Sequence, residues 1–261
     1  MLKKEIQIEY FKNKSDSSLR HFRKFIKTQD ASELHQMRVD LKKIKSLLNL
    51  SSDCQRSTIH SDRIKKINKV FKAAGKIRSL QLNLKILETD SLNNPDLRNV
   101  QLKILKDHYR DFYCNKKDYQ KILDNRKEKF AKNFRDIEDK CLLNFLGKSI
   151  RKLNLMFSPY SERKNFHKCR KIIKDLIYLN ELLPTEVRTD IRINLAYLKD
   201  LEDCIGKWHD NISGINFLQR VSSDKEITEN LKMKIEKYFK LILLYSENFK
   251  EKVILKNQFS I

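Results

Sequence analysis

Glycine and proline are scarce in this sequence, with four glycines and three prolines among 261 residues. Because these residues mark most turns, their scarcity leaves long uninterrupted stretches rich in leucine, isoleucine, lysine and glutamate. It also excludes a glycine-rich loop of the kind that cradles a nucleotide phosphate. The sequence therefore predicts an all-α protein without a substantial sheet.

Acidic residues are few relative to basic ones. The chain has 34 Asp and Glu against 56 Lys and Arg, a formal net charge of +22. Such an excess repels itself unless an anionic partner relieves it. Nucleic acid, an anionic membrane surface and free polyphosphate all fit this charge, while 40% hydrophobic residues suffice for a core.

Long apolar runs and paired cysteines are missing too. No window reaches the roughly 18 apolar residues that span a bilayer, and the N-terminal residues do not resemble a secretion signal. Five scattered cysteines are typical of thiols in a reducing compartment. We therefore expect a cytoplasmic protein without a membrane span. The cysteines are Cys54, Cys114, Cys141, Cys169 and Cys204.

Two His-x-x-Arg tetrapeptides, beginning at His35 and His167, are the most informative motifs present. A glycine follows each histidine, 40 residues later at Gly75 and 39 residues later at Gly206. The offset is thus 132 residues between the histidines and 131 between the glycines. This pattern indicates one structural unit written twice.

Capping residues and apolar periodicity predict eight helices, four in each half, with the boundary near residue 128. Asp30 and Glu33 have the spacing of a capping box before the second helix. The expected halves are four-helix bundles, 1–128 and 129–261. The expected helices are 3–28, 32–50, 57–89, 96–125, 133–157, 162–183, 186–221 and 224–256.

Each His-x-x-Arg opens a basic stripe on one side of a helix. Positions 0, +3, +7 and +10 of a helix fall within about 80° of one another. Faces that merely contact solvent usually mix Glu with Lys, whereas only Asp40 lies near the first stripe, and off its line. Two such stripes favour a polyanion as ligand. The first stripe is His35, Arg38, Lys42 and Lys45, and the second stripe is His167, Arg170 and Lys174.

The two glycines lie inside predicted helices, where glycine costs about 1 kcal/mol relative to alanine. Their matched positions predict that another helix or a ligand passes close to the backbone. Arg78 and His209, three residues after each glycine, would add one basic group per half.

Catalytic and metal-binding patterns are not recognisable. His167 and Cys169 are two residues apart and so point to nearly opposite sides of a helix. The sequence has no Gly-x-Ser-x-Gly elbow and no His-Glu-x-x-His helix. We expect no enzymatic activity, no metal and no cofactor.

With these motifs the chain resembles the CHAD domain, the conserved-histidine α-helical domain, over essentially its whole length. The matching residues of the first half are His35, Arg38, Val39, Lys42, Lys43, Ile44, Lys45, Gly75 and Arg78. Those of the second half are His167, Arg170, Lys174, Tyr178, Ile205, Gly206 and Asp210. Ser79 stands where the family usually has Asp, and Ile177 where it usually has Arg.

The resemblance implies two four-helix bundles related by a pseudo-twofold axis around a basic channel. It also implies non-catalytic binding of inorganic polyphosphate, and association with polyphosphate granules becomes a further expectation. The residues expected to bind polyphosphate are His35, Arg38, Lys42, Lys45, Arg78, Lys85, His167, Arg170, Lys171, Lys174, Tyr178 and His209.

Two other functions compete with this reading. A nucleic-acid-binding module fits the charge, but base stacking needs aromatic residues among the basic ones, and both stripes lack them. A metal-dependent polyphosphate or triphosphate hydrolase would need several carboxylates, and Asp210 with Ser79 at the matching place does not supply them. The sequence predicts no oligomeric state.

Overall fold

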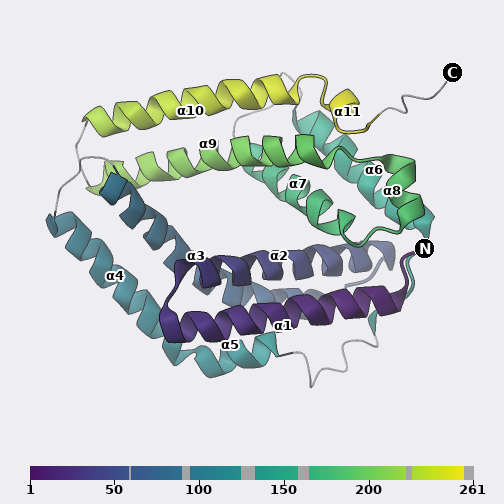
Figure 1. Cartoon of the computed structure of the whole chain (residues 1–261), viewed down its shortest axis with the longest axis horizontal. Coiled ribbons are helices and arrows are strands. Elements are labelled where there is room, and N and C mark those ends of the chain that lie inside the picture. Colours follow the sequence, from purple (N-terminus) through teal and green to yellow (C-terminus); the bar gives the residue numbers. More distant parts are fainter. Residues whose placement is uncertain (59, 90–94, 125–132, 158–164, 222–224, 256–261) are drawn as a thin grey trace. The chain divides into compact units, whose positions relative to one another are not determined.

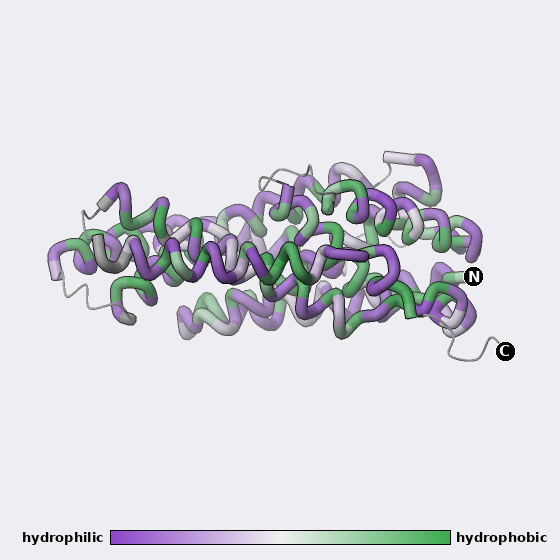
Figure 2. The backbone as a smooth tube through the Cα atoms, turned by 90° about the horizontal axis from the view of Figure 1, so that it is seen from above, coloured by the Kyte–Doolittle hydropathy of each residue, from purple (hydrophilic) through white to green (hydrophobic). Residues whose placement is uncertain are grey.

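The computed structural model describes residues 1–58, 60–89, 95–124, 133–157, 165–221 and 225–255. Every regular element in these ranges is an α-helix (Figure 1), which confirms the predicted fold class. Hydrophobic and hydrophilic residues alternate along the helices with the short period of an amphipathic helix (Figure 2).

Contacts divide the chain into two compact units, residues 3–136 and residues 1–2 with 137–261, called the first and second unit below. The predicted boundary at residue 128 lies outside the described residues. The helices of the first unit are α1 (Lys4–Thr28), α2 (Ala31–Cys54), α3 (Ser61–Thr89), α4 (Pro95–Cys114) and α5 (Lys116–Leu123). Those of the second are α6 (Asp139–Met156), α7 (Phe166–Asn180), α8 (Thr185–Ile191), α9 (Leu195–Val221), α10 (Lys225–Ser246) and α11 (Phe249–Lys252).

The prediction of four helices per half is wrong, because three predicted helices are each divided in two within the described ranges. The predicted helix 96–125 breaks at Asn115, between α4 and α5. The second unit breaks at Arg192 and Asn248, whose φ angles of 42° and 51° are left-handed. A left-handed residue ends a helix, but here neither one is the glycine that usually signals such an end.

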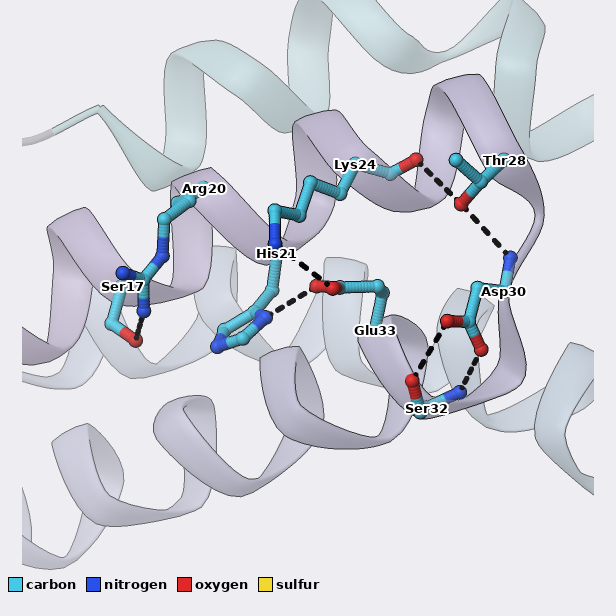
Figure 3. Close-up of polar contacts among 8 residues, drawn as sticks. All are labelled: Ser17, Arg20, His21, Lys24, Thr28, Asp30, Ser32 and Glu33. Carbon is cyan, nitrogen blue, oxygen red and sulfur yellow. Dashed lines mark hydrogen bonds and ion pairs between the residues drawn. The ribbon is translucent and has the colours of Figure 1, made fainter.

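Helix α1 packs antiparallel against α2, and the turn between them is held by a small polar network (Figure 3). Asp30 caps α2 by accepting from the backbone N–H of Ser32 at 2.7 Å. Glu33 departs from the predicted capping box. Its carboxylate lies 2.5 Å from Nδ1 of His21 and 3.3 Å from Nζ of Lys24, both on α1, so Glu33 ties the two helices together.

The core of each unit follows the predicted apolar stripes, with one change of register. On α7 the buried residue is Ile173, whereas the predicted Ile172 is only partly buried. Trp208 is buried on α9, as predicted. The buried stripe of α2 is Leu34, Met37, Leu41, Ile44 and Leu48.

The cysteine prediction is partly wrong. Cys54 and Cys141 are disulfide-bonded, while Cys114, Cys169 and Cys204 are free thiols. Sequence spacing does not reveal which distant cysteines approach one another. The cysteines therefore give no support to the prediction of a reducing compartment.

A fully buried histidine in the first unit makes stability depend on pH. His60 is inaccessible to solvent, and its Nε2 lies 3.0 Å from Oγ of Ser51. Its ring packs 5.2 Å from that of Phe134. Burial lowers the pKa of His60 from 6.5 to about 4.

We expect this histidine to weaken the fold in acid. Between pH 6.5 and 4 the unfolded chain binds a proton at His60 that the folded chain does not, so stability falls as pH falls. The full loss from this residue is roughly 3 kcal/mol. Urea unfolding at pH 7 and pH 4 measures it, and a His60→Gln variant should lose less stability over this interval than the parent. An identical loss in both proteins would contradict the assignment.

Candidate anion-binding sites

The first stripe lies on α2 and meets α3 at an aromatic ring. Arg38 donates a hydrogen bond from Nη1 to the backbone carbonyl of Phe71 at 2.6 Å, and its Cζ lies 4.0 Å from the centre of the Phe71 ring. Nζ of Lys45 lies 4.9 Å and Nζ of Lys42 lies 6.0 Å from the same centre. Three predicted residues therefore converge on one ring, through the attraction of cations for its π face.

Gly75 accounts for the position of Arg38. A Cβ atom at Gly75 would lie 2.8 Å from Nη1 of Arg38, closer than real Cβ contacts come. The glycine thus lets the guanidinium rest on the α3 backbone. The prediction of a close approach is confirmed, but what approaches is a side chain of the same motif rather than another helix or a ligand.

Arg38 stays charged in this half-buried place. Burial, and then the charge of Arg78 on α3, lower the pKa of Arg38 from 12.5 to about 10. At neutral pH the guanidinium is therefore protonated and lies within electrostatic reach of a second one. A phosphate group placed here would relieve both the desolvation and the repulsion.

The other predicted residues of the first unit lie at its edges. His35 is exposed in the first turns of α2. Lys85 is exposed on α3, fourteen residues after Phe71 and so about 21 Å further along the helix axis. The structure therefore does not bring Lys85 into the cluster around Phe71.

The second stripe lies on α7 and meets α9 at a carboxylate. Oε1 of Glu202 lies 2.6 Å from Nε of Arg170 and 2.7 Å from Nζ of Lys174. The Glu202 side chain is 17% exposed. Burial opposes its ionisation, but the hydrogen bonds and charges of Lys174 and Arg170 outweigh burial and lower the pKa of Glu202.

Gly206 repeats the arrangement of Gly75. A Cβ atom there would lie 2.7 Å from Nη2 of Arg170 and 3.1 Å from its Cζ. The arginine of each His-x-x-Arg motif therefore lies over the glycine that follows it on the neighbouring helix. This matching geometry explains why the two motifs recur together in the sequence.

Two histidines close one end of the second stripe. The rings of His167 and His209 stack, with centroids 5.0 Å apart and an interplanar angle of 27°. Burial lowers the pKa of His167, and the charges of Lys171, His209 and Arg170 lower it further. The His167 imidazole is therefore neutral at pH 7.

Tyr178 lies at the other end of the second stripe. Burial, together with the nearby charges of Glu202 and Asp175, raises the pKa of its phenol to about 12. Tyr178 is therefore a neutral hydroxyl at physiological pH.

Sequence reasoning missed Phe71 and Glu202, the two residues around which the stripes gather. Each lies four residues, one helical turn, before its glycine. Alignment of the two halves on the glycines would have placed them opposite each other. Neither residue belongs to a basic pattern, so the charge pattern alone gave no signal.

Two general searches of the described ranges bear on other functions. Among the residues that the structure describes, no group of three or more His, Cys, Asp or Glu side chains could hold a metal ion. No helix in the same ranges is long and apolar enough to cross a membrane.

Comparison with known proteins places the chain in a family. The family model of the CHAD domain matches residues 10–219. The crystal structure of the CHAD domain from the plant Ricinus communis is similar in fold, with a TM-score of 0.65 and 15% sequence identity over 95% of this chain and 89% of that chain. No curated protein matches the sequence. The motif match and the shared fold agree with the arginine-over-glycine geometry, and the chain belongs to the CHAD domain family.

Proposed function

We propose that this protein binds inorganic polyphosphate without hydrolysing it, through the first and second stripes. The convergence of Arg38, Lys42 and Lys45 within 6.0 Å of the Phe71 ring supports this most strongly. Like charges gathered on one rigid helical face repel one another, and a bound anion stabilises them.

Polyphosphate suits such a surface chemically. It carries roughly one negative charge per phosphate and has no bases to be read. Arginine can hold paired phosphate oxygens with its planar fork, and lysine supplies point charges. Helices hold these groups at fixed intervals, so little ordering of the protein is needed on binding.

Competition between polyanions tests this proposal. We expect long-chain polyphosphate to displace single-stranded DNA and RNA from the protein at equal phosphate concentration. We also expect no orthophosphate to be released from polyphosphate, with or without Mg²⁺ or Mn²⁺. Preference for either nucleic acid would favour a nucleic-acid-binding module. Metal-dependent turnover lost in an Asp210→Asn variant would instead favour a hydrolase.

A further inference from the structure

The two stripes are equivalent in sequence but differ at one position. Arg38 and Lys42 correspond to Arg170 and Lys174 by the offset of 132 residues. One turn before the glycines, however, the first unit has Phe71 and the second has Glu202. The same pair of cations thus faces an aromatic ring in one unit and a carboxylate in the other.

Glu202 lies where a phosphate oxygen would bind. A single oxygen, Oε1, contacts both Nε of Arg170 and Nζ of Lys174, at 2.6 and 2.7 Å. These are the lengths of charge-assisted hydrogen bonds. Because its pKa is lowered, the Glu202 carboxylate is ionised throughout the neutral range. Together the three side chains carry one net positive charge, whereas the arginine and lysine alone would carry two.

Phe71 does not compete in this way. Its ring attracts cations through the π face and presents no anion, and its backbone carbonyl takes a bond from Arg38. A phosphate approaching the first stripe therefore displaces no carboxylate. A phosphate approaching Arg170 and Lys174 must displace Glu202 or share its partners.

We propose that Glu202 is a built-in competitor that weakens anion binding at the second stripe and leaves the first stripe as the primary polyphosphate site. The inference rests on the proposed function and assigns to one carboxylate the difference in affinity between the two stripes. Removing the Glu202 charge should strengthen binding, the opposite of what loss of a merely structural ion pair would do.

A charge-neutral variant and a matched control test this. Glu202→Gln should bind long polyphosphate about tenfold more tightly than the parent, equivalent to about 1.4 kcal/mol. Its salt dependence should steepen by about one unit of slope, since one more phosphate is contacted. Asp203→Asn makes the same charge change at the next residue of α9, where the side chain is 61% exposed and pairs with Lys207. That control should change affinity by less than about twofold.

A second variant keeps the test decisive if Glu202→Gln does not fold. Phe71→Glu places a carboxylate at the matching position of the first unit and should weaken binding by about tenfold or more. Circular dichroism shows whether each variant remains helical.

The possible outcomes separate this inference from the proposed function. A parent protein that does not bind polyphosphate overturns both. A parent that binds, with a folded Glu202→Gln variant that binds no more tightly, overturns the inference alone. Equal gains in Glu202→Gln and Asp203→Asn reflect net charge and overturn it too.

Discussion

Replacing Arg38 and Lys42 together with alanine is expected to weaken binding of long-chain polyphosphate by about two orders of magnitude or more. A charge-assisted hydrogen bond is worth roughly 1.5–3 kcal/mol, and about 1.4 kcal/mol is a factor of ten in affinity. Both side chains meet α3 at Phe71, so their loss removes the centre of the first stripe. Equilibrium titration of helical variant and parent measures the effect.

The matched control removes two other lysines from the same unit. Lys103 and Lys106 are exposed on α4, so Lys103→Ala with Lys106→Ala makes the same change in net charge. We expect this control to lose much less affinity than the Arg38 and Lys42 variant. If both double variants lose affinity equally, the ligand responds to overall charge and the first stripe is not a site.

Ligand length adds information to the same comparison. The sequence predicts that both stripes line one channel, which stays a prediction. If one long chain engages both stripes, the second contact is effectively intramolecular and multiplies affinity. Short polyphosphate should then bind more weakly and respond less to loss of one stripe.

The corresponding change in the second stripe, Arg170→Ala with Lys174→Ala, is expected to lower stability. Glu202, 17% exposed, loses both printed partners and remains as a half-buried charge. The free energy of unfolding should fall by roughly 1–3 kcal/mol at pH 7. Affinity for polyphosphate should fall less than in the Arg38 and Lys42 variant, because these two cations already share a carboxylate.

The pH dependence of that loss identifies its cause. The folded pKa of Glu202 is below its ordinary value of 4.5, so its contribution to stability is present above pH 4.5 and disappears as pH falls through the lowered pKa. Urea unfolding should therefore show a smaller difference between variant and parent in acid than at pH 7. The control is Lys148→Ala with Lys152→Ala, exposed residues of α6. An equal loss of stability in this control would contradict the role of Glu202.

Much of the fold was predictable because helices impose a period on the sequence. The buried stripe of α2, from Leu34 to Leu48, follows directly from apolar residues spaced three and four apart. The breaks at Arg192 and Asn248 were not predictable, since each is a non-glycine residue held at positive φ. Their conformation depends on the surrounding packing, which no local propensity encodes.

The site was predictable in its charges and not in its partners. Repetition of His-x-x-Arg and glycine located Arg38 and Arg170, and the structure explains the pairing by placing each guanidinium over a glycine. Sequence symmetry also predicted equal stripes, an expectation that Glu202 now opposes. A single carboxylate on a lysine-rich helix carries no sign of which cations it will meet, because that depends on how α7 packs against α9.

One titration tests the central claim most directly: binding of long-chain polyphosphate to the parent protein at two salt concentrations. Release of condensed cations makes the logarithm of the affinity fall with the logarithm of the salt concentration, by about 0.9 per phosphate contacted in duplex DNA and about 0.7 in a single strand. We expect tight binding at low salt and a loss of at least tenfold on a fourfold rise in salt, which corresponds to several phosphates contacted. No binding at low salt, or an affinity that salt leaves unchanged, would contradict the account.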